Sequence, residues 1–213
     1  MKRLLACMAL LLCAPLDAEE PAPPFQVGPW ELGMSREQVL SFREFGPYKD
    51  VSVTGGVETW NAEFLGRKTN VAFVFDDAGV RYIQVDRYEG GSADAAIAAA
   101  MEIYDLFAEK FGGATVEKVN VKDQTSLDRG QIEAVLHTLL GKAQEAEKTA
   151  RKKNKATLLM RFDMKPILQP KGSRLHCQWV YAGRLDTFYI VLFQDRPDAP
   201  PRTVESSIVV ESL

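Results

Sequence analysis

The sequence contains few of the residues on which disulfide scaffolds depend. It has only three cysteines in 213 residues, and two of them, Cys7 and Cys13, stand within the first 18 residues. Those 18 residues are interpreted below as a cleaved segment, which leaves Cys177 with no intramolecular partner in an oxidising compartment. We expect Cys177 to be a small buried apolar residue, and an intermolecular disulfide or a reactive thiol is the alternative.

Residue types that hold metals or carry out catalysis are also scarce. The two histidines are His137 and His176. His176 and Cys177 are neighbours in a predicted strand, where successive side chains point to opposite faces, so the two cannot easily share an ion. The acidic pair Asp76 and Asp77 falls in a predicted turn, and no phosphate-binding loop, dinucleotide motif or nucleophile elbow occurs. We therefore expect no metal, no cofactor and no catalytic residues, and predict that the protein is not an enzyme.

Long apolar runs are absent except near the N-terminus. Residues 4–13 form one apolar run, preceded by Lys2 and Arg3 and followed by the small residues Ala14 and Ala18. The run is too short to cross a bilayer, which needs about 20 apolar residues. This pattern predicts a signal peptide over residues 1–18, cleaved near Ala18, and a periplasmic or secreted location, with a bacterial periplasm favoured.

A lipid anchor would require a cysteine after a small residue at the end of the apolar run. Almost no apolar run precedes Cys7, and Cys13 follows the bulky Leu12. We expect neither cysteine to be lipidated and no stable membrane insertion, with lipidation at one of them as the alternative.

The charge balance is mildly acidic. Residues 1–18 hold two of the 26 basic residues and one of the 29 acidic ones, so removing them changes the net charge from −3 to −4. An acidic chain disfavours nucleic acid or anionic lipid as the main partner. The remaining length suits one domain or two small units.

The first part of the mature chain predicts a tether followed by a compact unit. Residues 19–27 are rich in proline and are expected to form an extended tether. Within residues 28–90, Ser35 and Gln38 have the spacing of a capping box at a helix start, and Gly46-Pro47 ends that helix. Strands are predicted at 58–65, 69–75 and 80–88.

Residues 91–213 predict a second α+β unit. A helix begins after Ser92 and ends at Gly112-Gly113. A short strand follows at 116–121, and then a helix at about 130–155 whose second half is almost wholly charged or Ala. We interpret the charged half as a solvated helix end, with a docking surface as the alternative. Further strands are predicted at 157–164, 174–181, 187–194 and 204–210. This order indicates an α+β fold, an antiparallel sheet with helices packed on one face.

One stretch resembles a known family. Residues 32–39 (LGMSREQV), Gly46-Pro47, Trp60 and residues 73–80 (FVFDDAGV) follow one another as in the repeat of the small outer-membrane lipoproteins of the SmpA/OmlA type, which assist β-barrel assembly. The β-lactamase inhibitor proteins share the same αβββ layout. The resemblance covers residues 32–88 and implies an αβββ unit that binds other proteins. It also makes the second unit a candidate diverged repeat.

Aromatic residues in the predicted strands are the candidate binding surface. An antiparallel sheet often leaves one face exposed, and aromatics on that face indicate recognition. Phe188 and Tyr189 must point opposite ways. We expect a protein-binding surface that includes Trp60, Trp179, Tyr181 and Tyr189, in an exported, non-enzymatic binding or envelope assembly-support protein. The alternatives are an inhibitor of a secreted or periplasmic hydrolase, or an enzyme whose active-site residues converge only in three dimensions.

Overall fold

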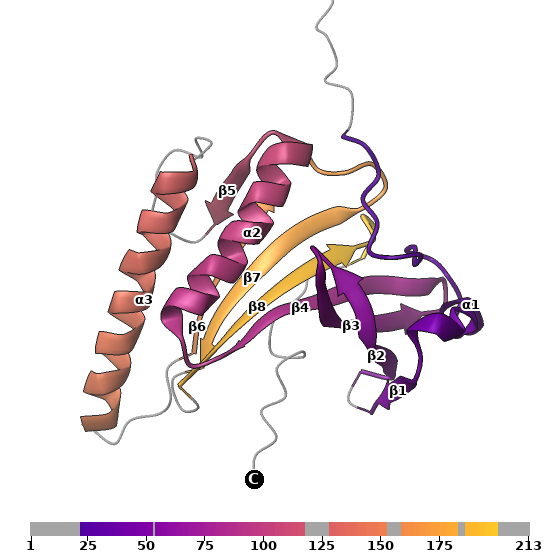
Figure 1. Ribbon diagram of the computed structural model, residues 1–213, viewed down its shortest axis with the longest axis horizontal. Coiled ribbons are helices and arrows are strands. Elements are labelled where there is room, and N and C mark those ends of the chain that lie inside the picture. The colour runs from indigo at the N-terminus through magenta and orange to yellow at the C-terminus, as the bar shows by residue number, and fades with distance from the viewer. Residues whose placement is uncertain (1–21, 53, 118–127, 153–158, 183–185, 200–213) are drawn as a thin grey trace, which may run out of the picture.

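The computed structural model describes residues 22–52, 54–117, 128–152, 159–182 and 186–199. In this part of the chain, eight strands form one antiparallel sheet in the order β1-β2-β3-β4-β8-β7-β6-β5 (Figure 1). The strands are β1 Tyr48–Val51, β2 Gly56–Phe64, β3 Arg67–Asp76, β4 Gly79–Gly90, β5 Ala114–Glu117, β6 Leu159–Pro166, β7 Arg174–Ala182 and β8 Thr187–Asp195; the helices are α1 Arg36–Ser41, α2 Ala93–Phe111 and α3 Arg129–Lys152, with a 3₁₀ turn at Arg43–Phe45. The predicted α+β class with helices on one face is confirmed.

The sheet consists of two similar halves. Each half begins with a helix and continues as four strands: α1 precedes β1–β4, and α2 precedes β5–β8, with α3 inserted between β5 and β6. The halves join where β4 pairs antiparallel with β8. The strand order therefore runs outward in both directions from this central pair.

The start of α1 is held by local hydrogen bonds and by contact with the β3–β4 hairpin. The capping box is present, because Ser35 Oγ accepts from Gln38 N and Gln38 Oε1 accepts from Ser35 N at 2.7 Å. Gly33 N donates to Val80 O, and Val80 N donates to Met34 O, both at 2.8 Å. The helix start and the hairpin, two parts of the sequence pattern that suggested the family resemblance, thus bind each other directly.

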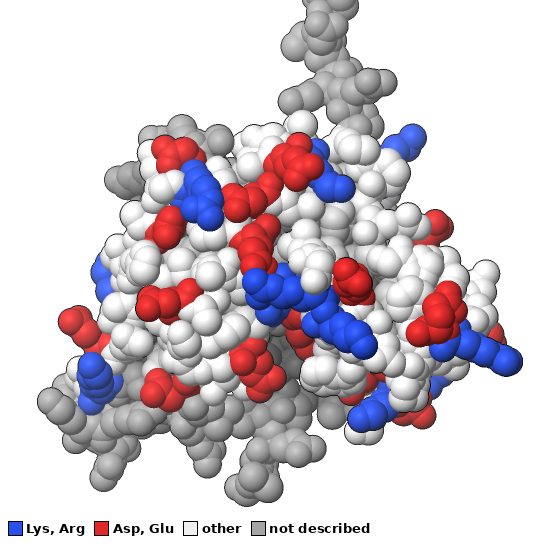
Figure 2. All heavy atoms as spheres, in the orientation of Figure 1, with Lys and Arg blue, Asp and Glu red and all other residues white. Residues whose placement is uncertain are grey.

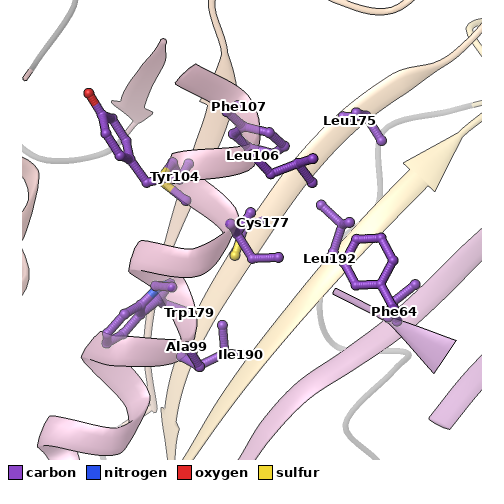
Figure 3. Packing of buried hydrophobic residues seen from close by; sticks show 14 of the residues in the cluster. Phe64, Ala99, Tyr104, Leu106, Phe107, Leu175, Cys177, Trp179, Ile190 and Leu192 are labelled. Carbon is purple, nitrogen blue, oxygen red and sulfur yellow. The ribbon is translucent and has the colours of Figure 1, made fainter. Parts of the chain in front are cut away.

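Helix α2 covers the second half of the sheet. Ser92 caps its N-terminus, and Gly112, with φ 75°, ends it in the left-handed conformation that glycine adopts most easily. Beneath it lie side chains from β7 and β8, including Cys177, Trp179, Ile190 and Leu192 (Figure 3). α3 packs on α2, with one buried stripe at helical spacing: Ile132, Leu136 and Leu140.

At four points the structure differs from the sequence-based expectations or describes only part of what they cover. Residues 22–27 are not a free tether: Phe25 and Val27 are buried in the core, and Ala22 bridges to Pro170. The short edge strand β1 was not predicted. The expected strand at 116–121 is described only as far as 117, and the expected strand at 204–210 lies outside the described residues.

None of the described helices combines the length and the apolar character that crossing a membrane requires.

Gly79 is predicted to be required by close packing. Its φ is +96°, and an added Cβ would lie 2.3 Å from Gly33 O and 2.6 Å from Met34 O, both backbone atoms. We expect Gly79→Ala to lower the free energy of unfolding by about 2–3 kcal/mol, measured by urea denaturation. Gly66→Ala is the matched control, since Gly66 also has positive φ but open space around it. It should cost only about 1 kcal/mol, and equal losses for both variants would contradict the packing argument.

Candidate binding site

The four aromatic residues expected to form a binding surface lie on opposite faces of the sheet. Trp179 and Tyr181 are 1% and 4% exposed and belong to the core on the helix side, so they cannot contact a partner there. Trp60 is 57% exposed and projects from the face opposite the helices, called the second face below. Phe188 packs in the core, so its neighbour Tyr189 points to the second face. Tyr189 is half-buried there. Only Trp60 and Tyr189 therefore remain as candidates.

Cys177 and the two histidines do not come together. Cys177 is fully buried beneath α2, and burial raises the pKa of its thiol, so it behaves as an inert core residue. His176 lies on the second face, stacked on Phe193 with ring centroids 5.1 Å apart. His137 lies in the groove between α2 and α3. Within the described ranges no group of three potential metal ligands forms.

The sheet forks between β3 and β4. The two strands pair from Asp76 with Gly79 as far as Val71 with Val85. Beyond that point, within the described residues, β3 pairs only with β2, and β4 pairs only with β8. A β-bulge lies beside the fork in each neighbouring pair, between Thr59 and Ala62 of β2 and between Asp86 and Tyr88 of β4. Bulges bend a strand locally, so they account for the separation of the two strands.

On the helix side the fork is closed by a buried arginine. Arg87 Nη1 donates to Phe64 O at 2.8 Å, and its Nη2 is 2.5 Å from Glu102 Oε2 of α2. The Arg87 side chain is 1% exposed, and its guanidinium carbon lies 5.5 Å from the centre of the Phe64 ring. Arg67 pairs with the same Glu102 at 2.7 Å. Both guanidinium groups at the fork are therefore directed to a carboxylate on the helix side.

On the second face the fork is lined by carboxylates and amides. Asn70 Nδ2 donates to Asp86 Oδ2 at 3.1 Å and to Glu58 Oε2 at 3.2 Å, so one amide joins two acids. The other Asp86 oxygen accepts from Gln84 Nε2 at 3.0 Å. Trp60 Nε1 donates to Glu58 Oε1 at 3.3 Å, which connects the exposed indole to this group.

The carboxylate of Asp86 is in an unfavourable environment for a charge. Burial raises the pKa of Asp86, and the negative charges of Glu89 and Glu58 raise it further, against the hydrogen bonds from Gln84 and Asn70. Neutral amides supply all the hydrogen bonds that Asp86 accepts through its side chain in the described part of the chain. Desolvation of a charge without a counter-ion is costly, and such groups occur often at functional sites.

The fork forms a pocket of about 310 Å³. Trp60, Asn70, Asp86, Glu89 and Lys68 are among its lining residues, with Arg67, Thr69, Arg87 and Tyr88. The volume is at the lower end of the range of small-ligand pockets, which suits a side chain or a small molecule.

A second hollow lies between α2 and α3 and has a different character. It has about 480 Å³ and is lined by several acids, but Arg129 lies 3.0 Å from Asp105 and 3.4 Å from Glu133. Figure 2 shows this side of the molecule, where acidic and basic side chains are interspersed over the helices. The acids of this groove thus have a counter-ion within the chain, in contrast to Asp86.

Sequence reasoning singled out Trp60 but not its polar neighbours. Gln84 and Asp86 alternate with Ile83 and Val85 in the predicted strand at 80–88, so one polar side of that strand was visible in the pattern. The connection to Asn70 and Glu58 depends on strand register, which the pattern does not contain.

The chain was compared with protein-family models, curated proteins and solved structures, and none of them matches it. The resemblance to the SmpA/OmlA type of repeat therefore stays a prediction.

Neutralising Asp86 is predicted to stabilise the fold at neutral pH. Because the folded-state pKa is raised above 3.8, the folded protein binds more protons than the unfolded chain just above that pH, and stability falls as the pH rises through this window. We expect Asp86→Asn to raise the free energy of unfolding at pH 7, and the gain to disappear below about pH 3.8. Denaturation curves at several pH values measure this difference.

The matched control is Glu63→Gln, an exposed carboxylate on β2. It should change stability by less than about 0.5 kcal/mol at any of these pH values. A destabilising effect of Asp86→Asn at pH 7 would show that the charged carboxylate is stabilising.

Proposed function

We propose that the protein is an exported, non-enzymatic binding protein that holds a protein partner on the second face of its sheet, around Trp60. The observation that carries this proposal is the exposure of Trp60. At 57% exposed it is the largest and most accessible of the exposed apolar side chains in the described residues, which also include Leu40, Leu65 and Ile167. Tryptophan contributes strongly to protein interfaces when it enters a partner's pocket.

The surroundings of Trp60 support recognition. Trp60 lies within β2 rather than on a loop, at the bulge between Thr59 and Ala62. Its Nε1 is held by Glu58, and a pocket opens beside it. A rigid aromatic side chain loses little conformational entropy on binding, which favours affinity. The resemblance to envelope assembly proteins and the predicted signal peptide are in keeping with a partner outside the cytoplasm.

An enzyme is the second candidate, favoured by the two carboxylates that Asn70 joins in the fork. Paired carboxylates can perform acid–base chemistry when their pKa values are separated. Here both acids are hydrogen-bonded to the same amide, and the described residues lining the pocket include no Ser, Cys or His. The fork is thus better suited to binding than to covalent catalysis.

Binding through Trp60 is tested by site-specific photocrosslinking in cells. A photoreactive phenylalanine at position 60 should give one discrete adduct, and the same group at Ile167, which is 41% exposed, should not. Trp60→Ala should reduce co-purification of the crosslinked partner at least about tenfold. Identical adducts from both positions, or none from position 60, would contradict a partner surface at Trp60.

Export is tested separately by expression with the native N-terminus in a Gram-negative host. We expect the protein in the periplasmic fraction, with Glu19 as the first residue by mass spectrometry. Replacing Ala18 by Trp should slow this cleavage, because the cleavage site requires small residues. Full-length protein that stays in the cytoplasm would refute the signal peptide.

A further inference from the structure

Three carboxylates lie at the fork: Asp86 and Glu89 line its pocket, and Glu58 shares the Asn70 amide with Asp86. Glu58, Asp86 and Glu89 form no ion pair with any described residue. The two arginines that line the fork, Arg67 and Arg87, are both bonded to Glu102 on the helix side. The charges that act most strongly on Asp86 are those of Glu89 and Glu58, and both disfavour its ionised form. A cation that entered from the second face would relieve this repulsion.

An unsatisfied acceptor in the same pocket points independently to a donor. Asn70 is 7% exposed and lines the pocket, and its Oδ1 is buried without a hydrogen-bond partner. The orientation of the amide follows from its neighbours, because Nδ2 must face the two carboxylates to which it donates. Leaving a buried carbonyl oxygen unpaired is costly, so a ligand N–H that reached it would be favoured.

Trp60 supplies an aromatic face at the edge of the pocket. Cations bind over the face of an indole, and arginine does so most often because its planar guanidinium also stacks. The same planar group donates several hydrogen bonds in a fixed geometry that matches carboxylates. Acceptors in the pocket and an aromatic ring beside them together define a site for a planar cation.

We infer that the fork pocket receives an arginine side chain of the partner protein, whose guanidinium pairs with Asp86, donates to Asn70 Oδ1 and packs against Trp60. This inference rests on the proposed function and specifies its chemistry. A polypeptide is favoured over a free amine because Trp60 is 57% exposed, which leaves surface that can contact the residues flanking the arginine. Lys68, the remaining cation of the lining, is exposed at the start of β3 and forms no ion pair among the described residues.

Binding should weaken in acid. The titratable and charged groups that line the pocket with Asp86 are Arg67 and Lys68 from β3 and Arg87, Tyr88 and Glu89 from β4. Glu58 from β2 also acts on its charge, and on β8 the residue paired with Asp86 is the apolar Val191. Asp86 gains a proton more readily than an ordinary aspartate as the pH falls, because burial raises its pKa. Protonation removes the charge that attracts the guanidinium.

The test is a titration of the ¹⁵N-labelled full chain with the peptide acetyl-Gly-Gly-Arg-Gly-Gly-amide, followed by NMR. We expect saturable shifts of the Trp60 indole N–H and the Asn70 side-chain amide at pH 7. The same peptide with Gln in place of Arg should bind at least about tenfold more weakly. The Lys peptide should fall between the two.

Two variants and one control identify the site. Asp86→Asn should weaken Arg-peptide binding at least about tenfold, and Trp60→Ala at least about threefold, the latter being an exposed position whose change does not affect the core. Glu109→Gln, an exposed carboxylate on α2, should leave binding unchanged. Equal binding of the Arg and Gln peptides, or full binding by Asp86→Asn, would overturn the inference. So would equal affinity for methylguanidine and the Arg peptide, since the pocket would then recognise a free cation.

Failure here is distinguishable from failure of the proposed function. A discrete crosslink at position 60 without Arg-peptide binding would support a partner surface at Trp60 and refute the arginine pocket. Arg-peptide binding without any crosslink would keep the cation pocket and reject the partner.

Discussion

The structure depends on one strand, β4, which joins the two halves of the sheet. Its first part pairs with β3 and its last part pairs with β8, with an overlap from Tyr82 to Val85. Through this overlap two four-stranded units become one sheet and share one core. A strand that pairs with two diverging strands must bend, and β4 bends at the bulge after Asp86.

The bend directs two neighbouring charged side chains, Arg87 and Asp86, to opposite faces of the sheet, and only the charge of Arg87 has a counter-ion there among the described residues. Arg87 turns to the helix side, where Glu102 and the Phe64 carbonyl satisfy it at 1% exposure. Asp86 turns to the second face, where it receives only neutral amides and is repelled by Glu58 and Glu89. The first arrangement is what a structural ion pair requires. The second is an environment that disfavours the charged carboxylate, which is why we propose a binding role for it.

Much of the fold follows from local chemistry that is visible in the sequence. The capping box at Ser35 and the cap at Ser92 correctly located the starts of two helices, and the glycines after Phe111 the end of the second, because caps and left-handed glycines act over three or four residues. The first helix ends at Ser41, before the predicted Gly46-Pro47, and a 3₁₀ turn follows it. Alternation correctly placed Phe188 and Tyr189 on opposite faces. It could not say which face the helices cover, and so Trp179 and Tyr181 were assigned to the surface although α2 buries them. The fork was beyond prediction, since it is set by pairing between β4 and a strand about 100 residues later.

The central claim is that Asp86 is a partly buried carboxylate whose counter-ion comes from another molecule. The most direct measurement is the pKa of its side-chain carboxyl by ¹³C NMR, first in the free protein and then with the Arg peptide at saturation. The account predicts a value above 3.8 in the free protein, which falls when the peptide binds because the guanidinium stabilises the charged form. A value at or below 3.8 in the free protein, or no change on saturation, would contradict it.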